Sequence, residues 1–134
     1  KTQVEQENPD REALVRIYKA LRLLQQQNGA ILPAEDRLRD ELARRGVQVS
    51  EACLCKAMQI WSEVGLAVAM RRGGERCWVL AGPSENKVRL DDSPTYHACQ
   101  LRRKAWLELL QWAGGQSDAA VIHQRAADVI KSYF

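Results

Sequence analysis

Glycines divide the first part of the chain into short segments, and this division limits the possible folds more than any other feature. Each of these glycines follows a run of residues with helical or extended periodicity. At the end of such an element the backbone often needs a positive φ, which glycine tolerates. They stand at positions 29, 46, 65, 73 and 74. The sequence therefore predicts several short elements instead of a few long ones.

Three helices are predicted around the first three of these glycines. Asn8 is a favourable N-cap and Pro9 suits the first helical position, so the first helix should begin here. Ser50 is the corresponding N-cap of the third helix, and the residue before Pro33 favours extended backbone. The expected elements are helices at 9–28, 33–45 and 51–64 and a short strand at 30–32.

A hairpin should follow, because the runs LAVAMRR and ERCWVLA flank Gly73-Gly74. Adjacent glycines accept the two positive φ values of a tight turn between antiparallel strands. The order helix, short strand, helix, helix, hairpin is that of a winged helix. We therefore assign residues 9–82 to a winged-helix domain and residues 1–8 to a polar N-terminal tail.

Residues 83–134 are predicted to form an extension of a different kind. The run at 87–90 could be a brief strand, and Ser93-Pro94 repeats the signature of an N-cap followed by proline. We expect two helices, at about 94–113 and from Ser117-Asp118 to the end, which pair with each other and pack on the winged helix because neither can bury its apolar side alone. The expected fold class is mainly α with a small β-hairpin.

Composition is typical of one globular domain. The chain has 134 residues, 46% of them hydrophobic, and 20 basic against 17 acidic residues give a net charge of +3. No apolar run approaches the roughly 18 residues of a membrane span, and the four cysteines lack zinc-ribbon spacing, so we expect a cytoplasmic protein with reduced thiols and no membrane partner. Because the chain starts at Lys1 and opens with polar residues, we expect a piece of a longer polypeptide.

Candidate catalytic groups are few. His97 and His123 are the two imidazoles, and no glycine-rich phosphate loop or metalloprotease motif is present. Asp91-Asp92 could bind a divalent ion, but a solvated turn before a helix explains this pair more simply. Cys53 and Cys55 point about 200° apart on a helix and cannot share one ion. We therefore predict no catalytic residue, no metal ligand and no cofactor in this segment.

Basic side chains indicate binding to nucleic acid. Three arginines lie around the hairpin tip with Glu75 among them, and a second basic cluster lies on the fourth predicted helix. An aromatic ring beside such arginines can stack on an unpaired base, whereas the third helix carries a net charge of −1 and suits a polyanion poorly. The candidate DNA-binding residues are Lys56, Arg71, Arg72, Arg76, Trp78, Arg102, Arg103 and Lys104.

Two other functions remain open on the sequence alone. Trp106 and Trp112 flank Leu109 and Leu110, so the fourth helix could carry an apolar surface that docks a protein. Tryptophans are also common in protein cores. Arginines at a hairpin tip are commonly solvated. A free-standing transcription regulator is the third alternative, and regulators of this fold usually dimerise on paired half-sites.

The segment KVRLDDSPTY at 87–96 resembles part of a known family. A leucine, acidic residues and Ser-Pro-x-Tyr open a long helix after a winged-helix-like stretch, and the chain ends VIKSYF. The pattern is similar to the C-terminal accessory domain of RecJ-type single-stranded-DNA exonucleases of the Firmicutes kind. The resemblance is most specific at Leu90, Ser93, Pro94 and Tyr96.

The resemblance implies a parent enzyme that degrades single-stranded DNA in the 5′-to-3′ direction during repair and recombination. A manganese or magnesium centre would belong to phosphoesterase motifs that this sequence does not contain, so no catalytic residue carries over. The implied partners are DNA, most simply single-stranded, and a replication or repair protein.

Overall fold

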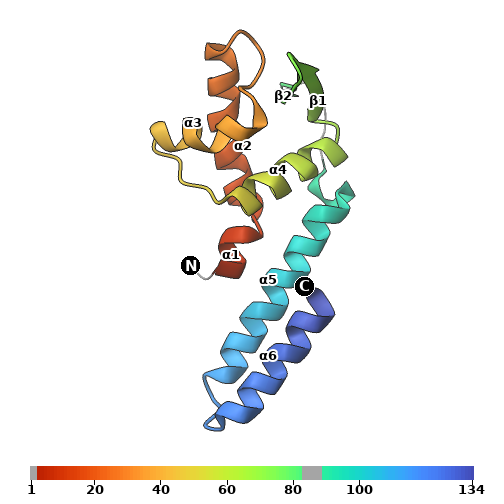
Figure 1. Cartoon of the computed structure of the whole chain (residues 1–134). Coiled ribbons are helices and arrows are strands. Elements are labelled where there is room, and N and C mark those ends of the chain that lie inside the picture. Colours follow the sequence, from red (N-terminus) through yellow and green to blue (C-terminus); the bar gives the residue numbers. More distant parts are fainter. Residues whose placement is uncertain (1–2, 83–88) are drawn as a thin grey trace.

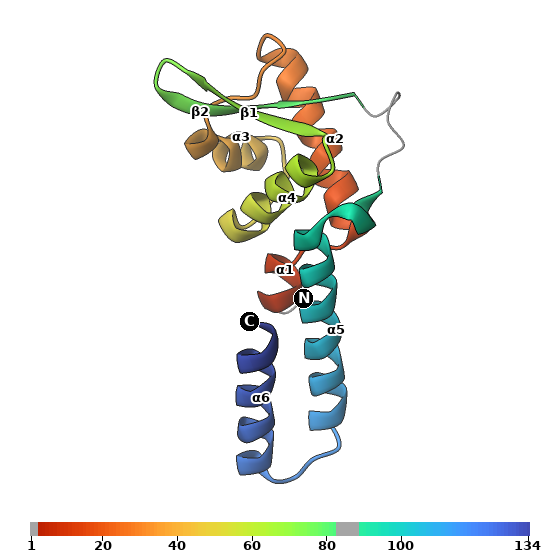
Figure 2. The ribbon, with the colours of Figure 1, turned by 90° about the vertical axis from the view of Figure 1, so that its right-hand side faces the viewer.

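The computed structural model describes residues 3–82 and 89–134, which form a mainly helical body and a projecting helical arm (Figures 1 and 2). The body contains the first four helices and an antiparallel hairpin, and the arm contains the last two helices. The helices are α1 (Gln3–Glu7), α2 (Arg11–Gln27), α3 (Leu38–Arg44), α4 (Glu51–Glu63), α5 (Pro94–Ala113) and α6 (Ala119–Tyr133). The strands are β1 (Ala67–Arg72) and β2 (Glu75–Leu80), and the 3-10 turns are η1 (Glu35–Arg37) and η2 (Leu90–Asp92).

These elements confirm the expected fold class of helices with one hairpin and two C-terminal helices. Ser50 and Ser93 are the N-caps of α4 and α5, and their hydroxyls accept hydrogen bonds from the backbone N–H groups of Cys53 and Tyr96, respectively, both at 3.0 Å. The turn glycines Gly73 and Gly74 have φ values of 61° and 81°. Side-chain capping and left-handed backbone thus place these boundaries where the sequence predicted them.

The beginning of the chain differs from the prediction. Residues 3–7 form helix α1 instead of a tail, and α2 begins after Asp10, whose carboxylate accepts the N–H of Ala13 at 2.8 Å. Asn8 is therefore not the N-cap of α2. Its side chain is buried and accepts hydrogen bonds from Lys56 of α4 and Arg102 of α5. Contacts with distant elements hold this short helix in place.

Two further segments are shorter than predicted. The second helix is divided into η1 and the seven-residue α3, although Leu38 and Leu42 are buried as expected. Residues 30–32 are not a strand, but the N–H of Leu32 donates to the carbonyl of Trp78 at 3.0 Å. This contact places the segment beside β2. The first half of the predicted strand at 87–90 lies outside the described residues, and Leu90 begins η2.

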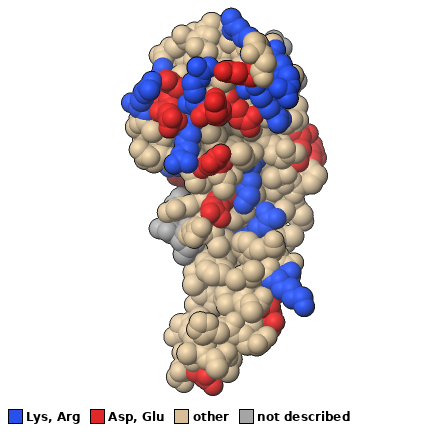
Figure 3. Space-filling view, viewed as in Figure 1, with Lys and Arg blue, Asp and Glu red and all other residues tan. Residues whose placement is uncertain are grey.

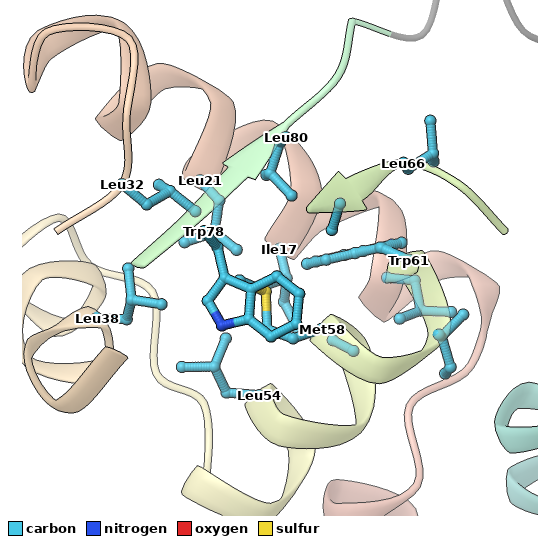
Figure 4. Packing of buried hydrophobic residues seen from close by; sticks show 14 of the residues in the cluster. Ile17, Leu21, Leu32, Leu38, Leu54, Met58, Trp61, Leu66, Trp78 and Leu80 are labelled. Atoms are coloured by element: carbon cyan, nitrogen blue, oxygen red, sulfur yellow. The ribbon is translucent and has the colours of Figure 1, made fainter. Parts of the chain in front are cut away.

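The core of the body packs between α2, α3, α4 and the hairpin (Figure 4). Leu21, Leu38, Leu54 and Met58 surround the Trp78 ring, which completes the core from β2. A smaller cluster of Ile31, Ala34 and Cys77 covers the opposite side of the same strand. Both sides of β2 are therefore buried, while β1 is exposed beyond its first residue.

Gln25 joins α2 to the hairpin through a buried amide. Its carbonyl oxygen accepts the Leu80 N–H at 2.7 Å, and its amide nitrogen donates to the Leu80 carbonyl at 2.9 Å. Arg22 donates to the same carbonyl at 3.0 Å. The side chain thus satisfies both backbone groups of Leu80 as a neighbouring strand would, which removes the cost of burying them unpaired.

The two helices of the arm pair with each other as predicted, and the arm meets the body through α5. The first turns of α5 contact α1 and α4, whereas α6 packs along α5 (Figures 1 and 2). Tyr96 and Cys99 of α5 are buried at this contact, but no residue of α6 is buried. The arm therefore has one helix docked at its beginning and a second helix supported by the first.

Candidate nucleic-acid interface

The hairpin carries the predicted arginines to an exposed tip. Arg71 stands opposite Arg76 in the strand register, and Arg72 stands opposite Glu75 next to the glycine turn. All four side chains are exposed. The alternation of a β-strand directs Arg71 and Arg76 to the side that carries the core residues, and Arg72 to the other side.

Carboxylates accompany some of these cations. Arg76 pairs with Glu35 of η1 at 3.5 Å and lies 4.8 Å from the centre of the Trp78 ring. Glu75 pairs with Arg37 at 3.2 Å. Arg71 donates to the carbonyl of Gly74 at 3.3 Å. Among the described residues, Arg71 and Arg72 have no carboxylate partner, so the uncompensated positive charge at the tip is theirs.

Trp78 is not available for stacking on a base, which corrects the sequence prediction. The side chain is 4% exposed and lies in the core of the body (Figure 4). The sequence showed an aromatic residue near arginines but not its side of the strand. Because both sides of β2 are covered, Trp78 stabilises the hairpin and offers no ring face to a ligand.

The exposed surface of helix α4 carries no basic side chain. Lys56 donates to the Asn8 side chain at 3.2 Å and is directed to the α1 junction. Glu63 faces α5 and is likewise removed from this surface. The exposed residues of α4 are Glu51, Ala52, Cys55, Gln59 and Ser62. A helix without a free cation has little attraction for phosphate.

An acidic hollow of about 510 Å³ lies between η1, α3 and the beginning of α4. Four carboxylates line it, against the single cation Arg39; they belong to Glu35, Asp36, Asp40 and Glu51. Burial raises the pKa of the Cys55 thiol at its edge, with further contributions from Glu35 and Glu51. Figure 3 shows acidic and basic side chains interspersed over the body. This acidic hollow opposes the approach of a polyanion along α4.

The second basic cluster is dispersed by the structure. Arg102 donates to the Tyr133 carbonyl at 2.9 Å and lies over the Phe134 ring at 5.9 Å, which ties the end of α6 to α5. Arg103 lies 4.0 Å from the carboxylate of Asp10. Lys104 is exposed. The first two side chains therefore connect elements of the fold, and the three do not form one cationic surface.

Glu63 forms a joint between the body and the arm that the sequence did not reveal. Its carboxylate accepts the Ser93 hydroxyl at 2.6 Å, the Thr95 hydroxyl at 2.7 Å and the Thr95 N–H at 3.0 Å. Gln59 donates to the same carboxylate at 3.0 Å. A carboxylate at the N-terminus of α5 also complements the helix dipole.

The hydrogen bonds at this joint change the acidity of Glu63. Burial alone would raise the pKa of the carboxyl, but hydrogen bonds from Ser93, Gln59 and Thr95 outweigh it and lower the pKa from 4.5 to about 2. Each hydrogen bond favours the charged form because it is donated to the carboxylate. Glu63 therefore stays ionised and attached to α5 at all but strongly acidic pH.

The arm exposes apolar side chains along both helices. On α5, Leu101, Leu107 and Leu110 are each more than 40% exposed. Ile130 of α6 and Phe134, which follows this helix, are about half exposed. Leu109, in contrast, is buried. In the view of Figure 3 much of the arm shows uncharged surface. The arm therefore presents several large apolar side chains to solvent on both of its helices.

The other candidate side chains lie apart from one another. Asp91 and Asp92 form the exposed turn η2 before α5. Within residues 3–82 and 89–134, no three His, Cys, Asp or Glu side chains form a group that could hold a metal ion. In the same part of the chain, no helix has the length and apolar character needed to cross a bilayer.

Compared with protein-family models, curated proteins and solved structures, the chain gives no match.

Proposed function

We propose that the chain is a non-catalytic accessory domain of a DNA-processing enzyme, of the RecJ type that its 87–96 segment resembles, and that its hairpin tip contacts the DNA backbone. The body would be a winged helix and the hairpin its wing. The observation that carries this proposal is the exposure of Arg71 and Arg72 at the tip without a carboxylate partner among the described residues.

The tip alone would make this contact. Arginine binds phosphate through charge-assisted hydrogen bonds that need an accessible guanidinium without a carboxylate partner. Arg71 and Arg72 meet this requirement, whereas the exposed residues of α4 carry no basic side chain. The contact should therefore be weak, dependent on salt and without strong preference for base sequence.

The test is a titration of labelled single-stranded and duplex DNA at two or more salt concentrations. Two phosphate contacts on a single strand predict a slope of about −1.4 for log affinity against log salt, since each contributes about −0.7. The double variant Arg71→Glu/Arg72→Glu should lose measurable binding and its salt dependence.

The matched control is Arg11→Glu/Arg16→Glu, which changes the net charge equally at exposed positions of α2. The control should bind DNA several-fold more tightly than the hairpin variant. If the two double variants bind equally, net charge and not the hairpin governs binding, and the proposal is wrong.

A second candidate function is a protein-interaction module that tethers the parent enzyme to a replication or single-strand-binding partner. The exposed leucines of the arm favour it, because Leu101, Leu107 and Leu110 are each more than 40% exposed. Undiminished DNA binding by the Arg71→Glu/Arg72→Glu variant, or no DNA binding by the unmodified chain, would favour this second function.

A further inference from the structure

The two edges of the hairpin sheet differ in their hydrogen bonding. The outer edge of β2 is occupied, because Leu32 donates to the Trp78 carbonyl and the Gln25 amide satisfies both backbone groups of Leu80. On the outer edge of β1, no backbone partner is present among the residues that the structure describes. The sheet can therefore grow by one more strand at β1.

The register identifies the free groups. The Ala81 N–H donates to the Leu66 carbonyl at 2.8 Å. Residues 66 and 81 are therefore a hydrogen-bonded pair, and so is every second pair after them in the hairpin. The intervening residues of β1, at positions 67, 69 and 71, direct their N–H and C=O groups outward. Three donors and three acceptors thus lie along an edge without bulge or proline, and the charged residues of β1, Arg71 and Arg72, stand at its end beside the turn.

The side chains beside this edge are apolar and exposed. Val68 is 66% exposed and Met70 is 43% exposed, and both lie on the side of β1 away from the core. Val68 has the largest exposed fraction of the exposed large hydrophobic residues in the described chain. A partner strand at this edge would cover both residues as well as satisfy the backbone.

We propose that the occupant of this edge is β1 of a second copy of the chain, paired antiparallel around Ala69 in a four-stranded sheet. In this register Val68 lies directly opposite Met70 of the partner subunit, and Met70 opposite Val68 of the partner subunit. The two exposed apolar residues of each copy therefore cover those of the other. The sequence of β1 is self-complementary in this register.

The charges at the ends of β1 agree with the same pairing. Arg71 lies opposite Ala67 of the partner subunit, so the two Arg71 residues are four positions apart, or about 13 Å at 3.3 Å per residue. Repulsion over this distance is largely screened at physiological salt. Arg72 approaches the beginning of the partner's β1, just after α4 ends, where the carbonyl end of a helix favours a cation.

Association should be weak and reversible. Pairing of two short strands buries less than the roughly 1,200 Å² of a stable complex. We expect monomers at about 10 µM and a substantial dimer population near 1 mM. The pairing does not depend on the proposed contact with DNA.

The test is sedimentation of the whole chain without nucleic acid over that concentration range, combined with amide hydrogen exchange. The weight-average mass should rise toward twice the monomer mass. The N–H groups of Ala69 and Arg71 should exchange about two- to fourfold more slowly at the high concentration, because they exchange only in the fraction of the chain that is monomeric.

The variant Ala69→Pro removes one outward N–H and leaves the hairpin's own hydrogen bonds intact, since this residue makes none of them. It should weaken association at least about tenfold, whereas Ala69→Val, which keeps the N–H, should not. Val68→Lys should act like the proline variant, with Leu23→Lys on α2 as its control. If circular dichroism shows that Ala69→Pro is unfolded, the lysine pair decides.

Three results would overturn the proposal. The first is a chain that stays monomeric near 1 mM. The second is a dimer that persists in folded Ala69→Pro or in Val68→Lys, which would place the interface elsewhere, for example on the arm. The third is a dimer in which the Ala69 amide exchanges as fast as in the monomer.

Discussion

Replacing Glu63 by alanine should separate the arm from the body before the body itself unfolds. The substitution removes three hydrogen bonds to Ser93 and Thr95 and one to Gln59. A hydrogen bond to a charged group contributes about 1.5–3 kcal/mol, but bonds that share one carboxylate are not additive. We therefore expect the free energy of unfolding to fall by about 2–4 kcal/mol in total.

The same joint should make stability depend on pH in the acid range. The pKa of Glu63 is about 2 in the folded chain, against the ordinary value of 4.5 that applies to the unfolded chain. The unfolded chain therefore binds the proton more readily. The stabilisation is therefore complete above pH 4.5 and is lost as the pH falls through 2. Glu63→Gln should lack this part of the pH dependence while keeping one acceptor oxygen.

Urea denaturation followed by circular dichroism, with amide exchange across α5, would measure both effects. The control is Glu75→Ala, which removes a carboxylate from an exposed ion pair with Arg37 and should cost less than about 1 kcal/mol. A Glu63→Ala chain as stable as this control would refute the reasoning. So would a Glu63→Gln chain whose stability between pH 4.5 and 2 follows that of the unmodified chain.

Two further predictions concern the core and the thiols. Trp78→Ala should lower the free energy of unfolding by about 3–5 kcal/mol. Trp78→Phe should lower it by less, because within residues 3–82 and 89–134 the indole N–H has no hydrogen-bond partner to lose. A folded Trp78→Phe chain with unchanged DNA affinity in titration would agree with the core position. Iodoacetamide at pH 8 should modify exposed Cys55 first. Burial and the nearby Cys99 raise the pKa of Cys53 to about 11, which should protect this thiol until the chain unfolds. Peptide mass mapping would show the order of modification.

Local chemistry made some boundaries predictable from the sequence. Ser93-Pro94 specifies the beginning of α5 because the hydroxyl caps the helix and the proline suits its first position, and neither effect needs distant residues. Gly73-Gly74 specifies the hairpin turn in the same way. Such signals are complete within four residues.

Features that depend on tertiary contacts could not be predicted in this way. Helix α1 has five residues, too few for a clear period, and Asn8 after it is held by Lys56 and Arg102 from distant helices. The core position of Trp78 follows from the covering of both sides of β2, which removes the alternation of polar and apolar residues that would have indicated its direction.

The candidate site was therefore only partly predictable. The sequence placed Arg71 and Arg72 at a turn, and the structure leaves them exposed there. It could not show that Arg76 meets Glu35 or that Arg102 and Arg103 serve contacts within the fold, because their partners are far away along the chain. Composition counts charges but does not pair them.

The buried amide of Gln25 has a consequence for the hairpin tip. Its two hydrogen bonds fit Leu80 alone, a residue 55 positions later in the chain. A slip of β2 by one residue would leave that amide unsatisfied and would turn Trp78 away from the main core, toward the smaller cluster around Ile31 and Ala34. The first long helix thus sets the alignment of the distant strands, and with it the direction in which the terminal arginines point.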